Sequence, residues 1–189
     1  MNKGLLIVYT GASGVGKGTI MKELLAKNPN LRLSVSATTR APREGEADGR
    51  EYYFVSHKQF DELIAEDGFL EHAEYVGNKY GTPKEPVFRM LSEGLDVILE
   101  IEVKGFLQVK KAYPDCVSVF IAPPSFEELQ ARLRGRGTES EEVIAERLKT
   151  AEQELQSKSL FDYVVINDDV ERAANEVLSI IQDRKNIKE

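Results

Sequence analysis

The apolar positions at the start of the chain form a short run without alternation, from 4 to 10, which predicts a strand buried on both faces. Glycines then interrupt the run. A helical spacing of apolar residues follows Lys17 and is carried by Ile20, Met21, Leu24 and Leu25. A strand, a glycine-rich loop and a helix in direct succession predict that the loop turns tightly and points N–H groups at an anion. The loop Gly11 to Lys17 is therefore expected to bind phosphate.

The rest of the chain continues as strand-like and helix-like segments in alternation, with no internal repeat. Leu31, Leu33 and Val35 alternate with polar residues, which predicts a half-buried strand. The further predicted strands cover 51–55, 69–76, 95–102, 116–121 and 162–166. This order favours an α/β fold in which a parallel sheet of about five strands carries helices on both faces.

Helix starts are predicted from capping residues. Ser56 caps a helix that carries Phe60, and Thr138 with Glu141 forms a capping box for the helix that carries Arg147. Further helices are expected from about 103, from 126 and over 170–185. The segment 80–82 leads from a turn at 77–78 towards a helix whose start stays open, because the prolines at 83 and 86 give conflicting signals.

Composition limits the classes of function. The 189 residues, 41% of them hydrophobic, are enough to bury the core of one domain, and no apolar run approaches the length of a membrane span. A net charge of -7 argues against a nucleic-acid duplex as the main partner, so positive charge at a phosphate site must be local. The single Cys116 allows neither a disulfide nor a zinc framework, and we expect a cytoplasmic protein.

The loop departs at one position from the phosphate-loop pattern, in which a serine or threonine follows the lysine. Gly18 stands there, so the hydroxyl that would help to hold Mg²⁺ is missing, and Thr19 is the nearest substitute. Period-two geometry puts Glu100 and Glu102 on one face at the carboxyl end of a strand, where open α/β sheets bind ligands. A solvated strand end is the alternative interpretation of Glu100.

The chain resembles the guanylate kinases, which belong to the nucleoside monophosphate kinases. The matching motifs run in family order from the first strand to the last: 11–17, 34–46, Tyr52, 69–74 with Glu71, 77–82, 133–138 and 165–169. The resemblance implies ATP- and Mg²⁺-dependent phosphorylation of GMP, and of dGMP, to the diphosphate in purine nucleotide metabolism. It also implies one domain over 1–189, with a core (1–34, 83–125, 159–189), a small mixed α+β GMP-binding lobe (35–82) and a helical lid (126–158).

Residue roles are carried over on matching positions only. The resemblance assigns ATP binding to Gly11, Ala12, Ser13, Gly14, Val15, Gly16, Lys17, Gly18, Thr19, Arg132 and Asn167. It assigns GMP binding to Ser36, Arg40, Arg43, Tyr52, Glu71, Tyr80, Gly81, Thr82 and Glu100. The implied catalytic residues are Lys17, Arg40, Arg136 and Arg147, and Thr19 would contact Mg²⁺ directly or through water. The family usually has aspartate at the position of Glu100.

The chemistry of the substrates is consistent with these roles. A phosphate monoester has a second pKa of about 6, so the attacking oxygen is largely anionic at neutral pH and needs no general base. The obstacle is repulsion between two polyanions, which positioning and positive charge overcome. Arg40 and Arg43 offer planar donors to a terminal phosphate. Glu71 would accept from N1–H and the 2-amino group of guanine, whereas adenine presents a lone pair at N1.

Two other classes remain as alternatives. Non-catalytic guanylate kinase-like domains bind proteins as scaffolds and typically lose the loop lysine or the lid arginines, whereas this chain has Lys17, Arg136 and Arg147. A nucleoside monophosphate kinase for another base would keep the loop without needing Glu71. The sequence leaves open whether the protein is a monomer or a homodimer.

Overall fold

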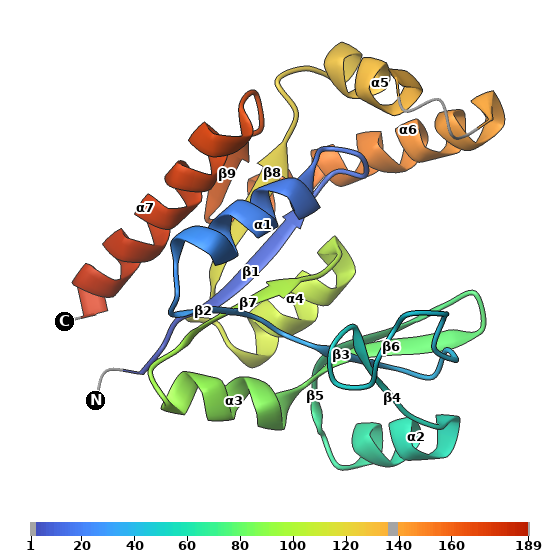
Figure 1. Cartoon of the computed structure of the whole chain (residues 1–189), viewed down its shortest axis with the longest axis vertical. Coiled ribbons are helices and arrows are strands. Elements are labelled where there is room, and N and C mark those ends of the chain that lie inside the picture. Colours follow the sequence, from blue (N-terminus) through green and yellow to red (C-terminus); the bar gives the residue numbers. More distant parts are fainter. Residues whose placement is uncertain (1–2, 136–139, 189) are drawn as a thin grey trace.

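The computed structural model describes residues 3–135 and 140–188 (Figure 1). The strands are β1 (Leu6–Gly11), β2 (Leu31–Leu33), β3 (Ser36–Thr38), β4 (Tyr52–Phe54), β5 (Phe69–Tyr75), β6 (Asn78–Pro83), β7 (Asp96–Glu100), β8 (Val117–Ala122) and β9 (Tyr163–Ile166). The helices are α1 (Lys17–Lys27), α2 (His57–Ala65), α3 (Lys84–Ser92), α4 (Val103–Ala112), α5 (Phe126–Gly135), α6 (Glu141–Gln156) and α7 (Val170–Lys188), with a 3-10 turn η1 (Lys158–Leu160).

Within the described residues, one sheet has five strands in the order β2-β7-β1-β8-β9, and every neighbouring pair is parallel. Residue Leu6 of β1 is level with Val97 of β7, and Ile7 is level with Val117 of β8. Helices cover both faces of this sheet, as the order of the elements predicted. The α/β class and the five-stranded parallel sheet are therefore confirmed.

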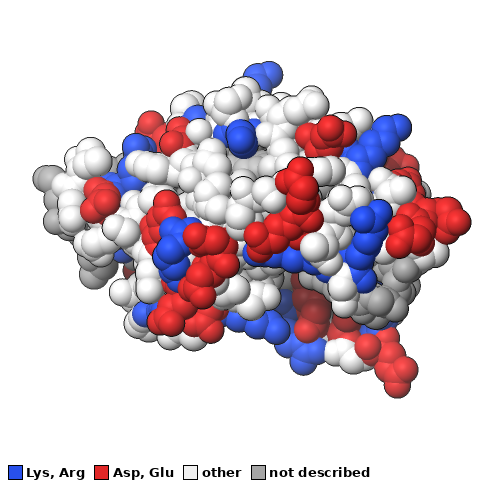
Figure 2. Space-filling view, turned by 90° about the horizontal axis from the view of Figure 1, so that it is seen from above, with Lys and Arg blue, Asp and Glu red and all other residues white. Residues whose placement is uncertain are grey.

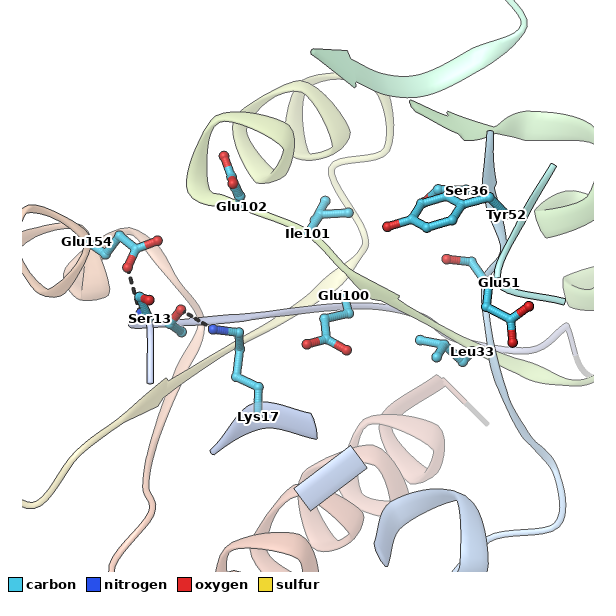
Figure 3. A pocket seen from close by; sticks show the side chains of 12 residues that line it. Ser13, Lys17, Leu33, Ser36, Glu51, Tyr52, Glu100, Ile101, Glu102 and Glu154 are labelled. Carbon is cyan, nitrogen blue, oxygen red and sulfur yellow. Dashed lines mark hydrogen bonds between the residues drawn. The ribbon is translucent and has the colours of Figure 1, made fainter. Parts of the chain in front are cut away.

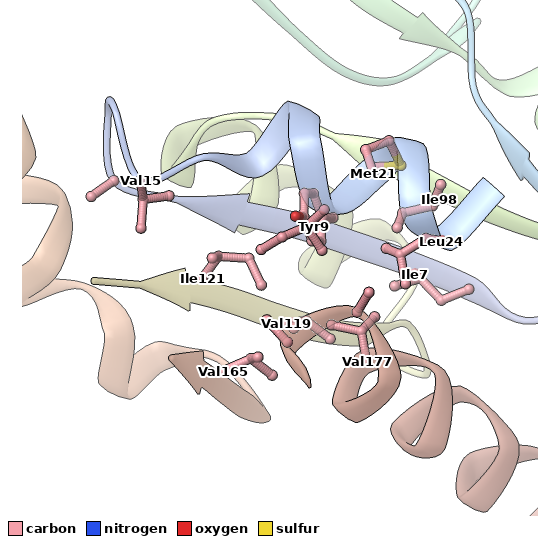
Figure 4. Close-up of a cluster of buried hydrophobic side chains, with 14 of the residues drawn as sticks. Ile7, Tyr9, Val15, Met21, Leu24, Ile98, Val119, Ile121, Val165 and Val177 are labelled. Atoms are coloured by element: carbon pink, nitrogen blue, oxygen red, sulfur yellow. The ribbon is translucent and has the colours of Figure 1, made fainter. Parts of the chain in front are cut away.

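The two faces of β1 pack into two different cores. Ile7 and Tyr9 join the cluster formed with α1 and α7, where Leu24 and Val177 meet them (Figure 4). Leu6 and Val8 face the opposite cluster with α3 and α4. Because apolar residues are needed on both faces, the strand reads as an unbroken apolar run. Cys116 is buried in the second cluster as a free thiol, as the sequence suggested.

A second sheet lies beside the first and has the order β4-β3-β6-β5 in the described part of the chain. It is mixed, since β3 pairs parallel with β4 but antiparallel with β6. Its small core stacks Phe60 of α2 on Phe69 of β5, with ring centroids 4.4 Å apart. Ser56 and Gln59 form a capping box at the start of α2, which confirms the predicted cap at Ser56.

The single strand predicted over 31–36 is wrong. Residues Leu31–Leu33 form β2, at the edge of the five-stranded sheet, whereas 34 and 35 belong to no strand and Ser36 begins β3 in the other sheet. Leu33, expected to face a core, is 38% exposed and borders a cavity instead. Alternation in so short a segment does not distinguish one strand from two that join different sheets.

Two predicted boundaries also move, and the helix start that was left open is now defined. The hairpin between β5 and β6 turns at Val76 and Gly77, both with positive φ, one residue before the predicted turn at 77–78. Residues 80–82 belong to β6 and lead directly to α3, as predicted. Pro83 is the N-cap of α3, and Pro86 falls in the first turn, where a missing N–H leaves no helical bond unmade. Ser140, not Thr138, caps α6 by accepting from the backbone N–H of Val143. Thr138 itself lies outside the described residues.

The predicted strand 95–102 is also shorter, because β7 ends at Glu100 and Glu102 precedes α4 as its N-cap. In the described part of the chain no helix is both long and apolar enough to cross a membrane. Acidic and basic side chains are interspersed on the face seen in Figure 2.

Candidate active site

The glycine-rich loop connects β1 to α1 and folds around the side chain of its own lysine. Gly14 and Gly16 have φ values of 83° and 94°, which glycine adopts without a steric penalty. The Lys17 ammonium donates to the carbonyl oxygen of Gly11 at 2.6 Å (Figure 3) and to that of Ala12 at 3.1 Å. Burial lowers the pKa of Lys17, although Glu154, Glu100 and Glu102 act in the opposite direction. The loop therefore presents a partly desolvated cation at the carboxyl end of the sheet.

Two predicted ATP-binding residues hold the back of this loop. Asn167, which follows β9 and is buried, donates from its side-chain amide to the carbonyl of Val15 at 2.7 Å. Arg132 of α5 donates to the backbone carbonyl of Asn167 at 2.9 Å and pairs with Glu128 at 2.5 Å. Both residues thus support the loop through contacts within the protein. The side-chain amide of Asn167 already donates a hydrogen bond to Val15.

Helix α6 contacts the front of the loop through Ser13. Glu154 accepts a hydrogen bond from the Ser13 backbone N–H at 2.8 Å (Figure 3). Arg147, seven residues earlier and so on the same side of the helix, donates to the Ser13 hydroxyl from two nitrogens at 3.3 Å. Desolvation raises the pKa of Glu154, opposed by its bond from Ser13 and the charge of Lys17. Two oppositely charged residues of α6 therefore meet at one loop residue.

Three neighbouring cavities line this edge of the sheet. The first has about 550 Å³ and is bordered by the loop, α6 and residues near the second sheet, among them Ser36 and Tyr52 (Figure 3). The second, about 390 Å³, lies over the start of α1, and the third, about 460 Å³, lies against β5 and β6. Glu100 borders all three. A molecule at the loop and a molecule at the second sheet would thus meet beside Glu100.

Glu71 is the most buried carboxylate of the third cavity, with 8% of its surface exposed. The Thr82 hydroxyl donates to its Oε1 at 2.6 Å. Burial raises the pKa of Glu71, and the bonds from Thr82 oppose that rise. The Thr82 hydroxyl, which the resemblance assigned to GMP binding, therefore donates its proton to the Glu71 carboxylate in this structure.

Arg40 and Arg43 differ in their surroundings. The Arg40 guanidinium bonds both carboxylate oxygens of Glu46, at 2.9 and 3.0 Å, and lies over the ring of Tyr52 at 5.5 Å. Arg43 is exposed, and within the described residues its side chain makes no hydrogen bond or ion pair. The Arg40 guanidinium is thus held in place by its partners. The Arg43 side chain is not, although the two residues are only three positions apart in the sequence.

The other predicted residues fall into clear groups. Ser36, Tyr52, Tyr80 and Gly81 border the third cavity together with Glu71, and the rings of Tyr52 and Tyr80 lie 6.0 Å apart. Thr19 and Gly18 border the second cavity with Glu100. Arg136, proposed from the sequence as a catalytic arginine, lies outside the described residues.

Sequence reasoning assigned no role to Glu154, Glu46 or Glu51. Glu154 meets Ser13 across 141 positions of sequence, so no local pattern could have revealed the contact. Glu46 lies within a motif that was recognised, six residues after Arg40, and that spacing was the only available signal. Glu51 borders the first cavity from the start of a predicted strand, where carboxylates are usually solvated.

The donor set is consistent with a divalent cation that arrives on a nucleotide. The second cavity brings together the Thr19 hydroxyl and the Glu100 carboxylate. Among the described residues, no group of three or more histidine, cysteine, aspartate or glutamate side chains could hold a metal ion. Mg²⁺ commonly uses one or two protein oxygens, with phosphate oxygens and water completing its shell. One hydroxyl and one carboxylate fit that requirement.

Comparison with known proteins gives one family. The guanylate kinase family model matches residues 3–184. A guanylate kinase from Carboxydothermus hydrogenoformans is 52% identical over 185 residues, which cover 98% of this chain and 91% of that protein. One from Caldanaerobacter subterraneus subsp. tengcongensis is 54% identical over 179 residues, covering 95% and 87%. The crystal structure of guanylate kinase from Anaplasma phagocytophilum superposes with a TM-score of 0.74 at 34% identity, covering 96% and 86%.

Proposed function

Since this chain belongs to the guanylate kinase family, we propose that it transfers the terminal phosphoryl group of ATP to GMP and releases ADP and GDP. The observation that carries this proposal is the shared border at Glu100 between the cavity over the phosphate loop and the cavity around Glu71. A donor and an acceptor nucleotide bound in these cavities would bring their phosphates together there. We further propose that residues 35–82 form the GMP-binding lobe and residues 126–158 the lid.

On the ATP side, the loop N–H groups and Lys17 would bind the phosphates of the donor. For this, the Lys17 ammonium would exchange its bonds to the Gly11 and Ala12 carbonyls for bonds to phosphate oxygens. Mg²⁺, held by the phosphates together with Thr19 and Glu100, would supply charge neutralisation when bound. Arg147 would add a second cation from α6, and Arg136 is proposed for the same role from the sequence alone.

On the GMP side, the acceptor phosphate would lie near Arg40, Tyr52 and Tyr80. The bond to Glu46 would keep the Arg40 guanidinium over the Tyr52 ring, so that little side-chain freedom is lost on binding. Arg43 would have to approach from its exposed position. No side chain is required as a general base, because the acceptor phosphate is already ionised near neutral pH.

Base selection would rest on Glu71. Its ionised carboxylate would accept from N1–H and the 2-amino group of guanine, while Thr82 holds Oε1 in place. Adenine offers a lone pair at N1, and the buried carboxylate would then face an acceptor without gaining a partner. Such a site can reject the wrong base by up to about 10⁴-fold.

A coupled assay of ADP formation with GMP, AMP, UMP and dTMP as acceptors tests the activity. We expect GMP to have the highest kcat/KM by a wide margin. Equal use of all four acceptors, or no ADP formation with any of them, would refute the proposal. A cytoplasmic location, and the expectation that neither a nucleic acid nor a membrane is a partner, remain predictions from sequence.

The proposed role of Glu71 in selecting guanine can be tested separately with Glu71→Gln, which keeps the size and shape of the side chain but turns one acceptor into a donor. We expect kcat/KM for GMP to fall by about 10²-fold or more, that for AMP to stay level or rise, and the KM for ATP to change little. Glu62→Gln, on the exposed side of α2, is the matched control. An unchanged ratio of GMP to AMP in Glu71→Gln would exclude Glu71 as the reader.

A further inference from the structure

The first turn of α4 lies directly against the Glu71 carboxylate. Gly105 in this turn is buried, and a Cβ atom at that position would lie 2.8 Å from Glu71 Oε2 and 3.2 Å from Glu71 Cδ. Favourable contacts between such atoms are about 3.5 Å or longer. The glutamate side chain therefore occupies the space that any larger residue at 105 would need.

The carboxylate has little room to move away from Gly105. On its other side, Oε1 accepts the hydrogen bond from Thr82 at 2.6 Å. The side chain is enclosed, with 8% of its surface exposed. A shift of the carboxylate by even a few tenths of an ångström would lengthen the Thr82 bond and change the direction in which both oxygens point.

The backbone is held as firmly as the side chain. Gln108, one turn after Gly105 on α4, bonds the residue next to Glu71 through both of its amide atoms. Its Oε1 accepts from the His72 N–H at 3.1 Å, and its Nε2 donates to the His72 carbonyl at 3.0 Å. Helix α4 and strand β5 are thus tied together beside the contact, so they cannot separate easily to admit a methyl group.

We propose that Gly105 is a specificity-positioning residue of the guanine pocket. Its missing side chain lets the Glu71 carboxylate lie against the first turn of α4, in the orientation that would meet N1–H and the 2-amino group together. This inference rests on the proposed function, because it concerns the same carboxylate. It adds a residue that borders the same cavity and would act on base selection by positioning Glu71.

The direct test is Gly105→Ala. The methyl group displaces Glu71, so we expect kcat/KM for GMP to fall by about tenfold or more, mainly through KM, with the KM for ATP unchanged. Lys111→Ala, on an exposed position of the same helix, should leave both unchanged. Wild-type kcat/KM for GMP in Gly105→Ala would overturn the inference.

A double-mutant cycle with Glu71→Ala separates a positioning role from a merely structural one. Without the glutamate side chain the methyl group has room. In that background Gly105→Ala should therefore weaken GMP binding no further, and it should raise the melting temperature, as alanine does when it replaces glycine in a helix. In the wild-type background the rise should be smaller or reversed.

If Gly105→Ala changed GMP binding and melting temperature equally in the two backgrounds, the proposed contact between Gly105 and Glu71 would be refuted. The double variant is expected to fold even if Gly105→Ala alone does not, and failure of both would also count against the inference. If the wild-type protein does not phosphorylate GMP, the proposed function fails. The melting temperatures then still decide whether Gly105 and Glu71 are coupled.

Discussion

At the scale of single residues, the charged groups of the site are held by the protein itself. Lys17 bonds two carbonyls of its own loop, Arg40 bonds Glu46, and Glu71 is bonded by Thr82. A side chain that is already ordered loses less entropy when a substrate binds. Single substitutions of these groups should therefore show which of them contribute to substrate binding, to catalysis and to folding stability.

Lys17→Ala tests the transition-state charge at the loop. We expect kcat to fall by at least about 10²-fold, because the lysine supplies positive charge where the transferred group is most negative. The fold should persist, since the lysine bonds only the loop carbonyls among the described residues. Turnover assays with circular dichroism check both points, and near-normal turnover would contradict the assignment.

The raised pKa of Glu71 predicts a pH-dependent contribution to stability. The unfolded chain keeps the ordinary value of 4.5, while burial raises the pKa in the folded protein. Between these values the folded state holds the proton more tightly, so folding stability falls as pH rises across the window. Glutamine does not titrate. The free energy of unfolding of the wild type minus that of Glu71→Gln should therefore decrease from pH 4.5 upward and then level off.

Denaturant unfolding of both proteins over a pH series provides the measurement. The contributions of Glu100 and Glu154, whose pKa values are also raised by desolvation, are common to both proteins and cancel in the difference. A difference in stability that does not change with pH would show that Glu71 is not desolvated in the folded state.

At the scale of elements, α6 and the phosphate loop act as one unit through Ser13. Arg147 bonds its hydroxyl and Glu154 its backbone N–H. The Glu154 carboxylate places a negative charge at a loop whose remaining backbone N–H groups are suited to binding phosphate. The helix therefore brings to the loop both an attractive and a repulsive group for a nucleotide.

Glu154→Gln separates the charge from the hydrogen bond, because the amide oxygen can still accept from Ser13. Removing one negative charge near Lys17 should lower the KM for ATP roughly threefold to tenfold at low ionic strength, with the KM for GMP less affected. Glu152→Gln, exposed on the same helix, is the control. A KM for ATP that is unchanged or higher in Glu154→Gln would show that the charge does not oppose the nucleotide.

At the scale of the whole molecule, the first cavity is bordered by three separate parts of the chain. Lys17 belongs to the phosphate loop, Glu154 to α6, and Ser36 and Tyr52 to the second sheet (Figure 3). A space of about 550 Å³ between them leaves room for the second sheet and the α5–α6 pair to approach the core (Figure 1). Two substrates that bridge these parts would draw them together.

GMP together with a non-hydrolysable ATP analogue should therefore compact the protein. Small-angle scattering should show a smaller radius of gyration with both ligands than with either alone, because each ligand alone bridges fewer of the three parts. Binding of both ligands is verified by calorimetry under the same conditions. A radius of gyration that does not change at saturation would contradict the proposed closure of the lobe and the lid.

Much of this fold could be predicted from sequence, because it is encoded locally. Residues 5–9 are all apolar since β1 is covered on both faces, and the glycines after the strand are needed for positive φ at Gly14 and Gly16. Motif spacing likewise indicated Lys17, the resemblance to the family indicated Arg40 and Glu71, and the family match is consistent with both. Each of these signals comes from residues that are close together in the chain.

Only the tertiary structure decided how those residues are held. The contacts of Glu154 with Ser13, Asn167 with Val15, and Thr82 with Glu71 leave no periodic pattern, because their partners come from different elements. The split of 31–36 between two sheets depends on which strands lie alongside, not on its own alternation. Gly105 gave no signal at all, since the need for glycine there arises because Glu71 of strand β5 fills the space beside α4.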